Sequence, residues 1–215
     1  MYEFIRGPLL WVAFIVFIAG LIYRVAALVN LSLKKDQVVY DHFSTSWALR
    51  SIFHWLLPLN RTVAQYPVYS IVTYAFHILL LGVPIFLLAH SVLWYESWQI
   101  SWWSLPEEVA DYLSLLMLAL ILFLIIRRMV APYARIVTTA ADYLLLVVVA
   151  LPFLTGYLAY HQWINYHLMV ILHMLSGELM LILIPFTKLS HMLLFFFSRA
   201  HIGSEFGERR GTVTW

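Results

Sequence analysis

The stretch YHLMVILHMLSGELMLILIPFTKLSHMLLFFF, residues 166–197, decides the fold. It is predominantly apolar and longer than the ~20 residues that an α-helix needs to cross the ~30 Å hydrocarbon core of a bilayer. His173 and His191 are eighteen positions apart. On one continuous helix this spacing places both imidazoles on the same face, ~27 Å apart. Ionisable side chains inside a membrane helix are costly, so both histidines are candidate functional groups.

The composition of the whole chain agrees with a membrane protein. Of its 215 residues, 63% are hydrophobic and 11% are charged, whereas soluble domains carry about 25% charged residues. The chain has no cysteine, which excludes disulfides, cysteine-ligated iron–sulfur clusters and thiolate zinc sites within it. The first apolar segment is long and lacks a small-residue cleavage site, so we expect it to be a retained span.

Five apolar segments in the chain are candidates for membrane spans. The sequence has neither an internal repeat nor a low-complexity segment. We therefore expect an all-α membrane protein, in which residues 1–215 form a single domain built as a five-helix transmembrane bundle. The expected spans are about 8–29, 69–94, 110–126, 140–160 and 166–197.

The placement of the thirteen basic residues predicts the orientation of the bundle, because cytoplasmic loops carry an excess of Lys and Arg. Only Arg6 falls on one side. We expect that side, with the N-terminus, to be outside, and the C-terminus to be cytoplasmic. The long first inner connection contains SWALRSIFHWLLPL, which predicts a short helix on the inner surface or a docking surface for a cytoplasmic partner. The basic residues on the inner side are Arg24, Lys34, Lys35, Arg50, Arg61, Arg127, Arg128, Arg135, Lys188, Arg199, Arg209 and Arg210.

Four of the nine histidines lie well inside the expected spans, two in the second span and two in the fifth, whereas His167 lies at the outer edge of the fifth. Two spans intervene, so these helices are expected to run antiparallel. His77 then lies level with His191 near the inner side, and His90 level with His173 near the outer side. Facing histidines on two bundle helices are the geometry of a bis-histidine haem b. We expect solvated or hydrogen-bonded roles for the other histidines: His42, His54, His161, His167 and His201.

The spacing of the two histidines in the second span predicts an irregular helix. His77 and His90 are thirteen positions apart, which puts them ~140° out of phase on a straight helix. Pro84 lies between them and can kink the helix, and a π-bulge would also change the phase. We therefore predict an irregularity within residues 82–86.

Several motifs resemble those of one known family. They are FHILLLG at 76–82, Leu105-Pro106-Glu107, ARIVTTAADYLLL at 134–146 and HMLSGELMLILIPFTKLSH at 173–191. Together they resemble the gamma (cytochrome b) subunit of respiratory nitrate reductase and its relatives, over nearly the whole chain after the first inner loop. Where that subunit has a lysine, this chain has Ala110 followed by Asp111. This difference from the nitrate reductase subunit favours a resemblance to the related membrane cytochromes of sulfate-reducer complexes, such as the high-molecular-weight cytochrome c complex.

The resemblance implies a function and a set of cofactors. It implies two haem b groups, an outer one held by His90 and His173 and an inner one held by His77 and His191. It also implies exchange of electrons with a quinone near the outer haem, and menaquinone is the quinone we expect. The implied partners are membrane lipid and iron–sulfur or multihaem cytochrome subunits, without nucleic acid, in a bacterial or archaeal cytoplasmic membrane. The chain would then be a non-autonomous electron-transfer subunit of a quinone-linked oxidoreductase.

Carboxylates near the expected quinone site are candidates for proton exchange, since quinone chemistry also moves protons. Asp111, Glu107 and Glu108 lie at the outer start of the third span, where acidic residues also simply suit a helix N-terminus. Glu178 lies inside the fifth span and is either a partner across helices or part of a proton path.

Two other classes of function remain open from the sequence. One is a haem-free anchor that holds a peripheral complex at the membrane. The other is a metal or proton transporter that uses the histidines, although such transporters tend to have repeated halves.

Overall fold

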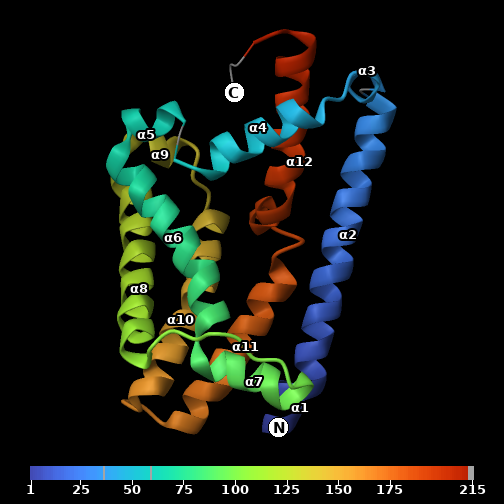
Figure 1. Ribbon diagram of the computed structural model, residues 1–215. Coiled ribbons are helices and arrows are strands. Elements are labelled where there is room, and N and C mark those ends of the chain that lie inside the picture. The colour runs from blue at the N-terminus through green and yellow to red at the C-terminus, as the bar shows by residue number, and fades with distance from the viewer. Residues whose placement is uncertain (36, 59, 213–215) are drawn as a thin grey trace. The chain divides into compact units, whose positions relative to one another are not determined.

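The computed structural model describes residues 1–35, 37–58 and 60–212, and all the regular structure in these ranges is helical (Figure 1). The elements before the second span are α1 (Tyr2–Phe4), η1 (Ile5–Leu9), α2 (Leu10–Lys35), α3 (Gln37–Asp41), α4 (Thr45–Leu56) and α5 (Arg61–Gln65). They are followed by α6 (Pro67–Phe86), α7 (Leu88–Trp98), α8 (Glu107–Val130), α9 (Pro132–Ile136), α10 (Ala140–His161), α11 (Tyr166–Leu183), η2 (Lys188–Ser190), α12 (His191–Ser204) and η3 (Glu205–Arg209).

Five helices among the described residues are long and apolar enough to cross a membrane, which confirms the prediction of an all-α, multi-pass membrane protein. Their surfaces suit contact with lipid, because large apolar side chains such as Ile15, Ile18 and Ile22 of α2 are each more than half exposed. The five helices cover Tyr2–Lys35, Pro67–Phe86, Glu107–Val130, Ala140–His161 and Tyr166–Leu183.

The chain divides into two compact units. The first unit comprises Met1, residues 3–67 and the part of the chain from Glu178 onward, and the second comprises Tyr2 and residues 68–177. The boundary between them cuts α11 after Gly177, so His173 belongs to the second unit and His191 to the first. The expected organisation as one domain stays a prediction.

The second span is shorter than the sequence indicates. We expected residues 69–94 to form one span, but α6 ends at Phe86 and α7 begins at Leu88. Leu87 between them has extended backbone angles (φ −71°, ψ 129°). The predicted irregularity therefore exists, one residue beyond the predicted segment 82–86, which is itself helical. The break lets α7 leave the axis of α6 (Figure 1).

The fifth span also ends earlier than predicted. Helix α11 stops at Leu183, and α12 begins only at His191. Pro185 has no backbone N–H to continue the helix, and Thr187 is extended, with its Oγ1 accepting a hydrogen bond from the Leu189 amide at 3.3 Å. His173 and His191 therefore lie on different helices. The premise of the helical-phase inference, one continuous helix from His173 to His191, is wrong.

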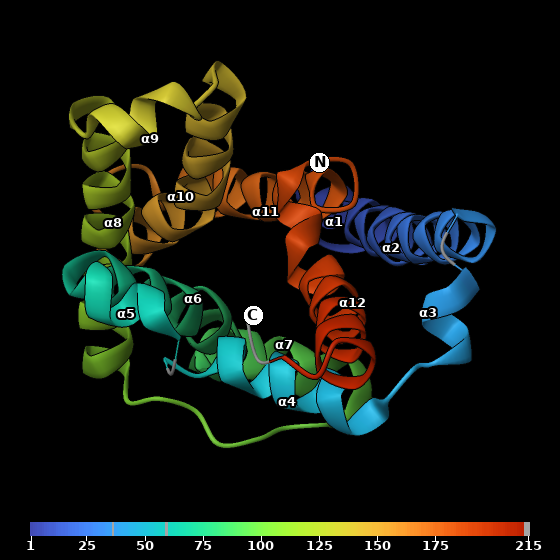
Figure 2. The same ribbon diagram turned by 90° about the horizontal axis from the view of Figure 1, so that it is seen from above.

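In the first unit, α4 packs against α12, as the view from above shows (Figure 2). The short helix predicted in the first inner connection is thus confirmed as α4. Small residues allow the close approach: Ala48 and Ser51 of α4 are buried, and Gly203 lies at the contact. A Cβ at Gly203 would lie 2.5 Å from the Ser51 Cβ and 2.6 Å from the Trp47 carbonyl oxygen. Alanine at this position cannot fit unless the helices separate.

We expect Gly203→Ala to destabilise the protein, because overpacking a tight contact costs ~1–3 kcal/mol. For a chain of this size this is a fall of several degrees in Tm, at roughly 2–4 °C per kcal/mol. Thermal unfolding in detergent measures the effect. Gly82→Ala is the matched control, because no heavy atom lies within 4 Å of the position of its Cβ. Equal Tm values for the two variants would contradict the packing described.

In the second unit, α8 and α10 lie side by side (Figure 1). Helix α10 begins with a capping box, in which the Thr139 side chain and Asp142 satisfy each other's backbone amides. It ends at His161, where Gln162 adopts the left-handed conformation (φ 53°). The N-terminus of α8 and the C-terminus of α10 therefore meet at one end of this unit.

Candidate functional site

Two of the four predicted histidines come together in the second unit. His90 lies on α7 and His173 on α11, with 5.9 Å between their ring centroids and 24° between the ring planes. They are 83 positions apart in the chain, so tertiary packing alone brings them together. This is the pair expected at the outer side.

Each of these two rings is held by a hydrogen bond from Nδ1 to a backbone carbonyl. His90 Nδ1 donates to the Pro84 oxygen at 2.8 Å, and His173 Nδ1 donates to the Pro152 oxygen at 2.8 Å. A carbonyl can only accept, so both rings carry a proton on Nδ1, and in the neutral imidazole Nε2 then bears a lone pair. This tautomer, fixed by a second-shell carbonyl, is the one in which histidine binds a metal through Nε2.

The break after α6 creates the carbonyl that holds His90. The last carbonyls of a helix have no partner within the helix and need one elsewhere. Three groups from outside α6 satisfy the carbonyls before Leu87. They are His90 Nδ1 on Pro84, Trp102 Nε1 on Ile85 at 2.7 Å, and the Leu105 amide on Phe86 at 2.8 Å.

Gly156 of helix α10 makes room for the His173 ring. A Cβ at Gly156 would lie 3.0 Å from both Cε1 and Nδ1 of the His173 ring. That distance is tighter than ordinary van der Waals contact. Gly156 therefore leaves the space that the imidazole occupies, while Pro152, one turn earlier, supplies the carbonyl that orients it.

The two inner histidines are held in the same manner, each within its own unit. His77 Nδ1 donates to the Thr73 oxygen at 2.7 Å in α6. His191 Nδ1 donates to the Lys188 oxygen at 2.8 Å, at the start of α12. Both side chains are exposed on their units. The pairing of His77 with His191 stays a prediction, because the two residues belong to different units.

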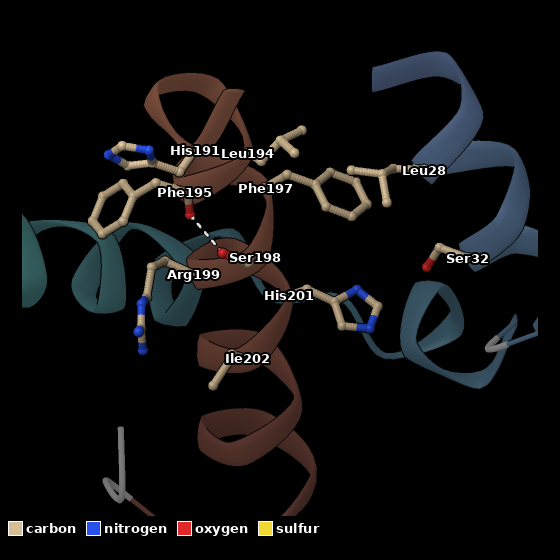
Figure 3. A pocket seen from close by; sticks show the side chains of 10 residues that line it. All are labelled: Leu28, Ser32, His191, Leu194, Phe195, Phe197, Ser198, Arg199, His201 and Ile202. Carbon is tan, nitrogen blue, oxygen red and sulfur yellow. Dashed lines mark hydrogen bonds between the residues drawn. The ribbon is translucent and has the colours of Figure 1, made fainter. Parts of the chain in front are cut away.

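His191 lines an open cavity of about 540 Å³ in the first unit (Figure 3). Phe197 and His201 point toward Leu28 and Ser32 of α2, whereas His191 and Arg199 lie on the other side of α12. The Arg199 guanidinium stacks over Trp55, 4.0 Å from its ring centroid. Burial lowers the pKa of Arg199 from its ordinary value. The cavity thus combines apolar walls with an imidazole and a cation.

The separation of the outer pair, though not its stacked arrangement, is of the size that two axial ligands of one haem iron would have. Two metal–nitrogen bonds of ~2.0 Å set end to end, with ~1 Å from each nitrogen to its ring centre, separate the centroids by about 6 Å. The observed separation is 5.9 Å. Within the described ranges, no three His, Cys, Asp or Glu side chains gather as a metal site. An axial pair needs no such cluster, because the porphyrin supplies the other ligands.

The candidate carboxylates have different surroundings. Asp111 is hydrogen-bonded to His161, with Oδ1 2.9 Å from Nε2, whereas Glu107 and Glu108 are exposed in the first turn of α8. Glu178 is only 4% exposed, and neither carboxyl oxygen has a hydrogen-bond partner among the described residues. The sequence indicated Asp111 but gave His161 no specific role, since nothing local marks a partner fifty positions away.

The fold and the site define a class: a multi-pass, all-helical membrane protein with a carbonyl-anchored histidine pair in its second unit. The chain belongs to the same family as a protein of Nitratidesulfovibrio vulgaris (strain Hildenborough), described only as "Protein". The two are 37% identical over 219 residues, covering 100% of this chain and 97% of that relative. No family model matches the chain. No solved structure matches it either.

Proposed function

We propose that the chain is the membrane cytochrome b subunit of a respiratory redox complex, similar to the gamma subunit of nitrate reductase. It carries electrons between a quinone pool, menaquinone for preference, and partner subunits through two b haems. His90 and His173 hold one haem, and His77 and His191 hold the other. The partners are iron–sulfur or multihaem cytochrome subunits, and the membrane is the cytoplasmic membrane of a bacterium or archaeon.

The observation that supports this proposal most strongly is the His90–His173 pair. A carbonyl bond to Nδ1 does not by itself mark a ligand, since the exposed His42 also bonds the Val38 oxygen at 3.2 Å. What distinguishes the pair is that two rings, both donating from Nδ1 to a carbonyl, lie 5.9 Å apart. Two axial ligands of one haem iron would have ring centres at about this separation, and the stacked rings would turn their Nε2 atoms toward the iron on binding it.

The residues of the chain would act as fixed holders of the cofactors. When bound, each haem supplies an iron that gains or loses one electron at a time. Neutral imidazoles avoid burying a net ligand charge in the bilayer. The Pro84 and Pro152 carbonyls orient the two rings, because each accepts a hydrogen bond from Nδ1.

The orientation that we propose places the N-terminus outside and the C-terminus in the cytoplasm. It follows from twelve of the thirteen Lys and Arg residues lying on one side of the predicted spans. Arg50 and Arg199, which stack on Trp47 and Trp55, then lie at the inner end. A cytoplasmic redox partner would approach there.

The haem content of the purified complex tests the proposal. A pyridine haemochrome spectrum should give about two b haems per copy of the chain. Absence of haem together with co-purifying peripheral subunits would favour a membrane anchor instead. Absence of haem together with metal or proton uptake into vesicles that contain the chain alone would favour a transporter.

A further inference from the structure

A hydrogen bond between an acid and a base joins two spanning helices at one end of the second unit. Asp111 lies on the first turns of α8, His161 is the last residue of α10, and Oδ1 is 2.9 Å from Nε2. With Asp111 ionised, its carboxylate can only accept, so Nε2 carries the imidazole proton. The other ring nitrogen, Nδ1, then bears a lone pair.

The His161 ring is fixed by aromatic neighbours as well as by Asp111. Tyr157 lies 4.4 Å from it between centroids, Tyr160 lies 5.2 Å away, and Trp163 stacks on it at 4.8 Å and 28°. Trp163 can reach back because Gln162 is left-handed (φ 53°). A non-glycine residue with positive φ is uncommon, and such conformations gather at functional sites.

The pair is oriented but remains accessible. The side chains of His161 and Asp111 are 25% and 22% exposed, so water or a ligand can reach them. His173 bonds the Pro152 carbonyl on the same helix α10, nine residues before His161, which is ~14 Å along the axis. Measured along α10, the His161–Asp111 pair therefore lies ~14 Å beyond the carbonyl that holds His173, at the end of the helix.

We propose that His161 is the group that exchanges protons with the quinone, and that Asp111 is its positioning partner. The inference rests on the proposed function. Nδ1 of His161 faces the substrate, while Nε2 donates to Asp111. This is the division of labour by which a carboxylate fixes a histidine tautomer and stabilises the imidazolium when it forms.

In quinol oxidation, a quinol hydroxyl would lose its O–H bond. The proton would go to Nδ1 of His161, and one electron would go to ferric iron of the proposed outer haem. His161 releases the proton to water at the open end of the helices. The outer haem would pass the first electron to the proposed inner haem. A second transfer of one proton to His161 and one electron to the reoxidised outer iron would complete the quinone, so two protons and two electrons leave in all. In quinone reduction the same atoms act in reverse.

Other titratable groups around His161 must be kept apart from it in any pH experiment. From α10 these are the hydroxyls of Tyr157 and Tyr160. From α8 they are Asp111 and, one turn earlier, the exposed Glu107 and Glu108. A purely structural bond between α8 and α10 is the competing explanation, and Asp111→Asn separates the two. Asparagine keeps an oxygen that accepts from Nε2 but removes the charge that stabilises an imidazolium.

The test is stopped-flow reduction of the haems by a menaquinol analogue in the purified complex, over a range of pH. We expect His161→Gln to slow reduction by about 100-fold, the usual size of general-base catalysis. We expect Asp111→Asn to slow it less, because asparagine still accepts from Nε2 of His161 but lacks the charge that stabilises an imidazolium. Reduction by dithionite should be unchanged in both variants. His167→Gln is the control, since the His167 ring stacks on Tyr2 and not on His161 or Asp111.

A second readout does not depend on turnover. In ¹⁵N-histidine NMR, the signals lost in His161→Gln should belong to a ring protonated on Nε2 and unprotonated on Nδ1. A quinol rate and pH profile like the wild type in His161→Gln, with both haems present, would overturn the inference alone. A wild-type complex without haem, or with haems that quinol never reduces, would instead overturn the proposed function.

Discussion

His173→Ala should remove one of the two haems and leave the other in place. Alanine takes away one axial nitrogen and the ring that the Pro152 carbonyl and Gly156 accommodate. Its partner His90 then faces a void, and a single imidazole in a site built for two does not retain a low-spin b haem. We expect the haemochrome absorbance per chain to fall by about half, and one of two waves to disappear from an optical redox titration.

Because His90 and His173 lie together, two further results are expected. His90→Ala should give the same loss, and the double variant should lose no more than either single variant, because both residues serve one cofactor. His167→Ala is the control on the same helix, six residues earlier, with its ring against Tyr2 at 5.6 Å. Full haem content in His173→Ala, or an equal loss in His167→Ala, would exclude the outer pair as ligands.

Gly156→Leu should abolish the same haem without replacing either of the proposed ligands. The first atom of the new side chain would stand 3.0 Å from two atoms of the His173 ring, and the rest would enter the space of the imidazole. His173 would have to leave the Pro152 carbonyl, which fixes its tautomer. We expect a loss of about one haem per chain, with unchanged far-UV circular dichroism, and a smaller loss for Gly156→Ala.

Gly177→Leu is the matched control for this substitution, since it also replaces a helical glycine in the second unit. Nothing lies within 4 Å of its Cβ position, so both haems should remain. If Gly156→Leu kept both haems while Gly177→Leu did not, the space beside His173 would have no bearing on cofactor binding.

The existence of the five spans could be predicted from the sequence because long apolar runs have few alternatives in a bilayer. Their ends could not, where distant groups compete for the backbone. Helix α6 stops before Leu87 because Trp102 and Leu105, far along the chain, take the carbonyls of Ile85 and Phe86. No pattern within residues 69–94 shows these partners.

The fifth span carries a local signal for its end. Pro185 and Thr187 together end one helix and begin another, so residues 173–191 do not form one continuous helix. In the site, the histidines could be singled out by their rarity in apolar segments. Gly156 and the Asp111–His161 bond could not, because each has meaning only once α10 lies against α11 or α8.

The sequence predicts only part of the environment of Glu178. Its position inside the fifth span makes it a candidate functional residue, and in the structure neither carboxyl oxygen has a hydrogen-bond partner among the described residues. What surrounds the carboxyl depends on packing that helical periodicity does not specify. Both predicted roles of Glu178, a contact across helices and part of a proton path, therefore stay predictions.

X-ray diffraction at the iron absorption edge, from crystals of the complex, tests the central proposal most directly. We expect one anomalous peak between the rings of His90 and His173, ~2.0 Å from Nε2 of each, and a second between His77 and His191. A map without iron between the first pair, or with that iron bound by other side chains, would contradict the account.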